Sequence, residues 1–227
     1  MSRSDVLVVS TDPQGSSVWW ASRAESLGRE LPFDYAQAHD DPGQLAHLRA
    51  TGARIHVVCN QKGGVGKTTI TVNLAATVHQ ALGSSGQDGR YQHIFIDTPG
   101  SIEDEHLLAA SLAVADDVLV PIPPEPLAFD PSARTIRKVV EPRGLPFRVV
   151  LNAWDPRDGE TDRDDTIAYV DAQGWPRART VIRRYKVHTR AGSEGTVVTE
   201  YPKNRVSMEA RADFAQLALE LGYGGRP

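Results

Sequence analysis

The sequence predicts an α/β fold: a doubly wound, mostly parallel sheet with helices on both faces. Short continuous apolar runs alternate with amphipathic stretches at helical spacing, which is typical of repeated strand–helix units. Parallel strands are covered on both faces, so they appear as unbroken apolar runs. The predicted strands lie at residues 5–10, 33–38, 55–59, 94–97, 117–122 and 147–152. Polar loop residues follow most of these runs, at the sheet edge where ligands bind in such folds.

Composition sets the class of protein. The 227 residues, 40% of them hydrophobic, can bury one substantial core, so we expect a single domain over residues 1–227. Cys59 is the only cysteine, which excludes an internal disulfide and fits a reducing cytoplasm. The N-terminus has no apolar signal region, and no apolar run approaches the roughly 18 residues of a membrane span. We therefore expect a cytoplasmic protein that does not bind membranes.

The first block of the chain covers residues 5–54. Its first strand is followed by the loop Thr11-Asp12-Pro13-Gln14-Gly15, a predicted helix at 17–27 and a short edge strand. A second helix is predicted to begin at Pro42, since proline is favoured at the first helical position. Asp12 has two explanations that the residues alone leave open: a helix cap, or a carboxylate at a ligand-binding sheet edge.

A glycine loop follows the next strand. It reads Lys62-Gly-Gly-Val-Gly-Lys-Thr-Thr69 and leads into an amphipathic helix that continues through Val78. Glycines let successive backbone N–H groups point at one anion, and the helix directs its positive end to the same place. In such a loop Lys67 reaches the β- and γ-phosphates of a nucleotide and Thr68 ligates Mg²⁺. The usual phosphate-loop pattern needs glycine at position 61, where this chain has Gln61.

With a second lysine at its head, the loop resembles the deviant Walker A box of the ParA/MinD family of P-loop NTPases. The resemblance implies ATP and Mg²⁺ as cofactors, and it gives Lys62 a role across a dimer interface, at the partner's nucleotide. The residues that it implies for nucleotide binding are Gly63, Gly64, Val65, Gly66, Lys67, Thr68 and Thr69. The single cysteine argues against a relative that holds an iron–sulfur cluster through cysteines, the nitrogenase iron protein.

Two aspartates complete the resemblance. The segment Ser10–Gly15 looks like the Asp-x-Asp-Pro-Gln-Gly segment of ParA proteins, with Ser10 in place of the first aspartate, and it implies that Asp12 orients the attacking water. Asp97 ends an apolar strand like that of the family's Walker B segment, so it would hold a water on Mg²⁺. Gly100, after it, can approach the γ-phosphate. Relatives contact adenine near the position of Asn152, for which a turn-forming role is equally expected.

The order of these blocks departs from the family. In ParA relatives the phosphate loop precedes the Asp-Pro-Gln strand, whereas here residues 5–54 precede the loop block at 55–83, and a Gly/Ser-rich linker at 84–90 leads directly to the remainder at 91–227. We hypothesise a rearranged chain, natural or engineered, that keeps the family's spatial fold. Rewiring is feasible because right-handed crossovers are kept. It predicts the family's spatial order, 3-2-4-1-5-6-7 in family numbering, with Asp12 close to Lys67.

The last third of the chain contains the helices and charged segments of the fold. Helices are predicted at 105–115, 131–140 and 206–221, the second a candidate for the dimer face and the last with Met208, Phe214, Leu217 and Leu221 facing the core. The acidic stretch 155–165 is expected to be a solvated loop rather than a metal site. Between Arg177 and Arg190 lie six cations and no acid, although the net charge is −4, which suggests contact with a polyanion. Those cations are Arg177, Arg179, Arg183, Arg184, Lys186 and Arg190.

The resemblance implies an ATPase of plasmid or chromosome partition. Such an enzyme would form an ATP-dependent homodimer, bind DNA non-specifically through residues 177–190, associate with the nucleoid and respond to a ParB-like centromere-binding partner. One alternative is a MinD-like or cargo-positioning ATPase that works on another surface. Others are a metabolic synthetase or amidase that shares the loop, and a rearranged scaffold that binds nucleotide with little turnover.

Overall fold

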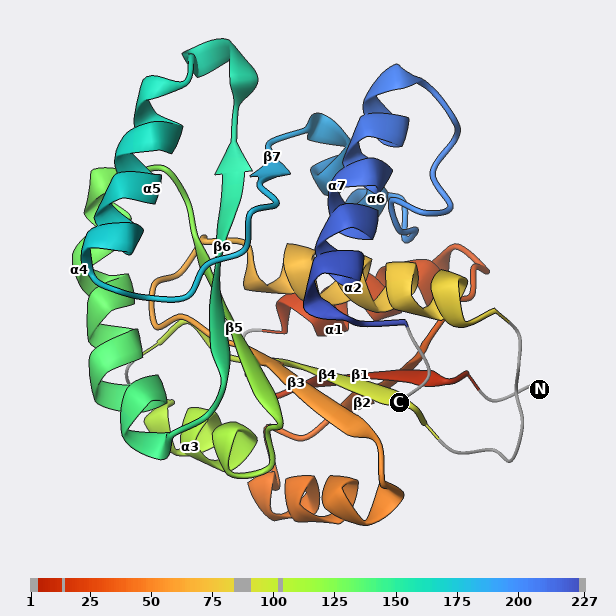
Figure 1. Cartoon of the computed structure of the whole chain (residues 1–227). Coiled ribbons are helices and arrows are strands. Elements are labelled where there is room, and N and C mark those ends of the chain that lie inside the picture. Colours follow the sequence, from red (N-terminus) through yellow and green to blue (C-terminus); the bar gives the residue numbers. More distant parts are fainter. Residues whose placement is uncertain (1–3, 14, 84–90, 102–103, 225–227) are drawn as a thin grey trace.

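One parallel sheet organises the molecule (Figure 1). The computed structural model describes residues 4–13, 15–83, 91–101 and 104–224. Within them the strands form one sheet in the order β2-β1-β4-β3-β5-β6-β7, and every neighbouring pair is parallel. The strands are β1 (Val6–Ser10), β2 (Asp34–Gln37), β3 (Arg54–Val58), β4 (His93–Asp97), β5 (Asp117–Ile122), β6 (Phe147–Trp154) and β7 (Ile182–Arg183). The predicted fold class and strand order are both confirmed.

Helices cover both faces of the sheet (Figure 1). The α-helices are α1 (Ser16–Ser26), α2 (Lys67–Leu82), α3 (Glu105–Ala113), α4 (Pro126–Thr135), α5 (Thr161–Ala172), α6 (Lys186–Ser193) and α7 (Arg205–Leu221). Three 3₁₀ helices are η1 (Pro42–Thr51), η3 (Glu141–Arg143) and η4 (Pro156–Asp158), and η2 (Ile136–Val140) is a π-helix. The predicted linker at 84–90 lies outside the described residues.

The core has two halves because alternate strand residues point to opposite faces. Val57 packs in the half covered by η1, α3, α4 and α5, whereas its neighbour Val58 packs in the half covered by α1, α2 and α7. Phe214 and Leu217 of α7 are buried in the second half, as expected. The prediction for Met208 is wrong: it is 47% exposed, because the buried face of α7 carries Ser207, Ala210 and Leu217, and Met208 lies on another face of the helix.

Strand register places three loops side by side. Ser10 of β1 pairs with Asp97 of β4, and Asp97 in turn pairs with Val58 of β3. The three strands therefore end at the same level, and the segments that follow them leave one rim of the sheet together. This explains how residues far apart in the chain reach one site.

A buried polar network lies at the opposite rim, where β3, β4 and β5 begin. His56 Nδ1 contacts Asp117 Oδ1 at 2.9 Å, and His56 Nε2 contacts His93 Nδ1 at 2.9 Å. Tyr223 donates its hydroxyl to Asp117 Oδ1 at 2.6 Å, and Arg54 pairs with Asp117 Oδ2 at 3.0 Å. Burial lowers the pKa of His93 to about 4, and the neighbouring His56 and Arg54 act in the same direction. Burial opposes ionisation of Asp117, but contacts with His56, Tyr223 and Arg54 outweigh it and hold the pKa of its carboxyl below the ordinary value.

His93 is therefore expected to contribute a loss of stability in acid, whereas Asp97, whose pKa is raised to about 6, acts in the opposite direction. The folded protein holds His93 neutral down to a pKa of about 4, whereas the unfolded chain takes up that proton near pH 6.5, so stability is lost as pH falls between these values. The loss amounts to about 2–3 kcal/mol of unfolding free energy. Urea unfolding between pH 7 and pH 4 measures it. His93→Gln should flatten this pH dependence, whereas His47→Gln, at an exposed histidine, should leave it unchanged; equal slopes for wild type and His93→Gln would contradict the assignment.

Candidate nucleotide-binding site

The glycine loop joins β3 to α2 and turns on two left-handed glycines. Gly64 and Gly66 have φ of 79° and 87°, a region that side chains with a Cβ rarely adopt. Gly66 immediately precedes α2, and no side chain caps the helix. The first N–H groups of α2 are therefore available to an anion, and the helix dipole favours negative charge at this end.

Lys67 holds a positive charge inside this loop. Its side chain is only 7% exposed, and Nζ donates to the carbonyl oxygen of Lys62 at 3.3 Å. Burial lowers the pKa of Lys67, and the nearby carboxylates of Asp97 and Asp12 oppose that shift. These carboxylates supply the negative charge that a buried ammonium requires, and the same ammonium can bind a phosphate group.

Gly100 permits a close approach between the loop after β4 and the glycine loop. A Cβ at this position would lie 2.9 Å from Lys67 Nζ and 3.1 Å from the Gly63 Cα atom. A side chain here would displace either the ammonium or the backbone. Gly100 therefore lies against the glycine loop, and its approach to the γ-phosphate stays a prediction.

Thr68 and Asp97 form a centre that fits Mg²⁺. Thr68 donates its hydroxyl to Asp97 Oδ2 at 2.8 Å. The other carboxylate oxygen of Asp97 is buried and has no hydrogen-bond partner within the described residues. Burial raises the pKa of Asp97 to about 6, although the hydrogen bond from Thr68 and the charge of Lys67 lower it. A hydroxyl beside an unpartnered carboxylate oxygen is the oxygen chemistry that Mg²⁺ prefers, so these residues fit the ion.

Asp12 reaches the same cavity from β1. Its side chain is 8% exposed, and its backbone N–H donates to Ser10 Oγ at 3.3 Å. A cavity of about 890 Å³ is lined by Asp12 together with Gly63, Gly64, Gly66, Lys67, Thr68 and Thr69. Thus the predicted proximity of Asp12 to Lys67 is observed, and the residue at the cap position of α1 is Gly15 and not Asp12.

The remaining predicted residues have different surroundings. Val65 is buried beneath the loop, and Lys62 is partly exposed, with no ion pair among the described residues. Asn152 is 3% exposed and donates its side-chain amide to the carbonyl oxygen of Val65 at 2.7 Å. It therefore contacts the glycine loop itself. Its contact with adenine stays a prediction, as does the role of Lys62 across a dimer interface.

Sequence reasoning missed the residues that anchor the loop from α4. The buried Asn60 donates to the Pro121 carbonyl oxygen at 2.9 Å and to Ser132 Oγ at 2.8 Å, and its Oδ1 accepts from the Lys62 N–H at 2.9 Å. The Gln61 N–H donates to Thr135 Oγ1 at 3.1 Å. The only signal in the sequence is an Asn between strand and loop, where Asn commonly bonds to backbone two residues on.

The far wall of the cavity was also unexpected. It is formed by Trp19, which is 55% exposed, and by one side of α6, through His188, Thr189, Gly192 and Ser193. α6 packs tightly on α1: a Cβ at Gly195, just after α6, would lie 2.5 Å from the Ala24 Cα atom. Periodicity cannot reveal this contact, because the two helices are far apart in the chain.

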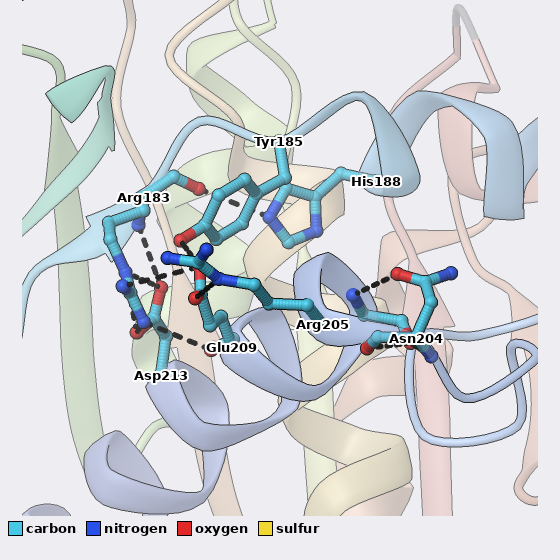
Figure 2. Close-up of polar contacts among 8 residues, drawn as sticks. Arg183, Tyr185, His188, Asn204, Arg205, Glu209 and Asp213 are labelled. Atoms are coloured by element: carbon cyan, nitrogen blue, oxygen red, sulfur yellow. Dashed lines mark hydrogen bonds and ion pairs between the residues drawn. The ribbon is translucent and has the colours of Figure 1, made fainter. Parts of the chain in front are cut away.

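The basic segment is less basic than its sequence suggests. Arg183 is held by both carboxylate oxygens of Asp213 and also lies 3.8 Å from Glu209, as Figure 2 shows. Arg177 pairs with Asp171 at 2.7 Å, and Arg179 lies 3.7 Å from Glu220. The expectation of six unopposed cations is therefore wrong, because acids of α5 and α7 fold back onto the segment. The cations that are exposed and have no ion pair among the described residues are Arg184, Lys186 and Arg190.

These three cations surround a second cavity, of about 670 Å³. Its other lining residues include Arg157, Tyr185 and Arg205, and Figure 2 shows Tyr185 and Arg205 both bonded to Glu209 of α7. Lys186, Val187 and Arg190 of α6 face this cavity, whereas other residues of the same helix face the first. α6 thus separates the two cavities.

The acidic stretch at 155–165 and the helices of the described residues bear on metal and membrane binding. No group of three or more His, Cys, Asp or Glu side chains there has an arrangement that holds a metal ion. The acidic stretch is partly helical, since α5 begins at Thr161, and Asp162 and Asp164 lie in its first turn, where the helix dipole favours them. None of the helices among the described residues is long and apolar enough to cross a membrane.

Comparison with known proteins agrees with this geometry. Residues 56–84 match the family model described as the CobQ/CobB/MinD/ParA nucleotide binding domain. The maintenance of carboxysome distribution protein A of Gloeobacter kilaueensis is 31% identical over 223 residues, which cover 95% of this chain and 80% of that protein. A protein of the same name from Halothiobacillus neapolitanus is 26% identical over 185 residues, covering 62% of this chain and 84% of that one.

Solved structures share the fold. The MinD protein in the MinC:MinD cell division complex of Aquifex aeolicus superposes with a TM-score of 0.57 at 17% identity, covering 74% of this chain and 96% of that one. Cyanothece McdA(D38A) in complex with ATP gives a TM-score of 0.53 at 14% identity, covering 99% of this chain and 87% of that one.

Proposed function

The chain belongs to the ParA/MinD family of P-loop ATPases, and on that premise we propose that it is a MgATP-hydrolysing ATPase that positions a cargo. The observation that carries the proposal is that Asp12, Lys67 and Thr68 line one cavity, and that the buried Asp97 accepts a hydrogen bond from Thr68. These residues supply the charges and ligands that phosphoryl transfer requires.

Catalysis in this site would depend on positioning and electrostatics. The buried Lys67 ammonium and the N–H groups of the glycine loop bind the phosphates and stabilise the negative charge that develops on them. Thr68 and Asp97 would hold Mg²⁺, which neutralises phosphate charge when it is bound. Asp12, which lines the same cavity, would orient the attacking water. Lys62 completes the site of a second copy in an ATP-dependent homodimer.

Cargo positioning fits the relatives better than plasmid partition does. The protein that is 31% identical over 95% of this chain has a name that refers to carboxysome distribution. We therefore propose an adaptor protein on a cargo as the stimulating partner, in place of the ParB-like partner expected from the sequence. The metabolic alternatives gain no support from the relatives, which are both distribution proteins.

We further propose that non-specific DNA on the nucleoid is the surface on which the ATPase works. Arg184, Lys186 and Arg190 are exposed cations around one cavity, and they belong to a chain whose net charge is −4. Cations without internal partners attract phosphate backbones and release counterions on binding. The position of α6 between this cavity and the nucleotide cavity supports a link between nucleotide state and DNA binding.

The proposed exchange of chain segments is supported by short distances between the relevant ends. Ser4, before β1, contacts His79 of α2 at 3.1 Å, and the Arg54 N–H at the start of β3 donates to the Gln92 carbonyl oxygen at 3.0 Å. In the family's order these neighbouring points would be joined directly. Both connectivities are therefore compatible with one sheet.

Replacing Asp12 tests its catalytic role. Asp12→Ala should lower single-turnover hydrolysis at saturating MgATP by about 100-fold, since water loses its orienting carboxylate, whereas calorimetry should show little change in ATP affinity. Asp104→Ala, at another carboxylate that lines the cavity, serves as the control and should hydrolyse normally. Unchanged hydrolysis by Asp12→Ala would remove it from the mechanism.

A triple substitution tests the DNA surface. Replacing Arg184, Lys186 and Arg190 with Ala should weaken binding to duplex DNA and reduce the slope of log K against log salt by up to about 3. The control replaces Arg49, Arg163 and Arg177, which have the same total charge but pair with acids elsewhere. If both triple variants bind DNA equally, net charge explains the effect and the cavity does not bind DNA.

Reordering the segments tests the proposed exchange. A chain of residues 55–90, then 4–54, then 91–227 should fold cooperatively, with a melting temperature within about 4 °C of the original, because both new junctions join neighbouring points. Circular dichroism and MgATP calorimetry measure this. A reordered chain that fails to fold would show that the blocks are not exchangeable.

A further inference from the structure

We infer that the rim of the sheet opposite the nucleotide cavity carries a second binding site, which takes a small monocarboxylate with an apolar body. A cavity of about 480 Å³ lies there, where β3, β5 and β6 begin, and residues at the C-terminal end of α7 line part of it. Small-molecule sites in proteins commonly have this size. The inference goes beyond the proposed ATPase function and does not depend on it.

Arg148 is the cation that is available to a ligand in this cavity. It lies on β6 and is exposed, and no hydrogen bond or ion pair holds its side chain within the described residues. Burial and the neighbouring Asp117 raise the pKa of the Tyr223 hydroxyl, and the charges of Arg54 and Arg148 oppose that shift. Two guanidinium groups from different strands therefore act on the same part of the cavity.

The carboxylates of the cavity already have partners. Asp117 pairs with Arg54 at 3.0 Å. Glu220 accepts two backbone N–H groups, at 2.7 and 2.9 Å, and lies 3.7 Å from the Arg179 guanidinium. Since each acid has its own donors or countercharge, the guanidinium of Arg148 is left to bind an anion.

The rest of the wall is apolar and determines the body of the ligand. Leu145, Phe147 and Leu221 are partly buried and line the cavity together with Pro146 and Pro176. An aliphatic or aromatic group placed between them would be removed from water, which is the main favourable contribution to binding in sites of this kind. The ligand therefore has a charged end and an apolar end.

A single negative charge matches the site better than two. A guanidinium presents a planar fork of N–H donors that fits a carboxylate, and the 48% exposed Arg54 side chain has further donors for the same group. Arg148 without an ionic partner balances one negative charge. The second charge of a phosphate monoester would remain unbalanced beside Asp117 and Glu220, so the site favours a carboxylate.

Two probes that differ in charge test the site. 3-Phenylpropionate has a carboxylate and an aromatic body, whereas 3-phenylpropionamide has the same body without the charge. In an NMR titration of the full chain, 3-phenylpropionate should bind with a Kd on the order of 1 mM and shift the amides of residues 117–119, 145–148 and 220–223. The amide probe should bind about tenfold more weakly.

Three outcomes of this titration would overturn the inference. The first is a set of shifts confined to residues 62–69, which would place the probe in the nucleotide cavity. The second is equal affinity for the charged and uncharged probes. The third is the absence of any shift with 3-phenylpropionate up to about 10 mM.

A matched pair of arginine variants gives a second test. Arg148→Gln should weaken 3-phenylpropionate about tenfold and leave 3-phenylpropionamide unchanged, because only the contact with the charge is lost. Arg134→Gln, at an exposed arginine of α4 that also lacks an ion pair among the described residues, is the control and should keep the affinity of the wild type for both probes. Equal affinity of the two variants for 3-phenylpropionate would remove Arg148 from the site and refute the proposal.

Discussion

The in-register pairing of β1, β4 and β3 is the constraint on which the site depends. Because Ser10, Asp97 and Val58 lie level across the sheet, the segments that follow them begin at one rim. Parallel strands require crossovers over the sheet, and the chain meets that requirement with helices on both faces. The site is therefore a property of strand register, and the order in which the chain visits the strands matters less.

Burial of charge is the second constraint, and it links the two aspartates to the glycine loop. An ammonium as enclosed as that of Lys67 requires nearby negative charge, and Asp97 and Asp12 supply part of it. Asp97 in turn is stabilised by the Thr68 hydroxyl and by Lys67. Two carboxylates face one ammonium here, so an anion is favoured at this rim when it arrives together with a cation.

Local patterns in the sequence predict much of this molecule. The apolar runs identify the strands, and the glycine loop with its two lysines identifies the phosphate site, because these features depend on neighbouring residues. The surroundings of Arg183 could not be predicted, since Asp213 lies on a helix that packs back from far along the chain. The prediction for Met208 was wrong because the face of α7 that packs on the sheet carries Ser207 and Ala210, small or polar residues that apolar spacing does not identify.

The same distinction explains Asn152. Asn152 lies near the end of a strand and close to a nucleotide site, a position that fits both a base contact and a turn. Only the packing of the folded chain shows that its amide contacts the glycine loop. The missing side chain of Gly66 and the amide that fills its place are two parts of one contact. Gly66 is thus required for two reasons. Its backbone is left-handed, and the Asn152 amide occupies the space where its side chain would lie. Asn152 is far away in the sequence, as the 87 residues between it and Val65 show, so this second reason cannot be found from neighbouring residues.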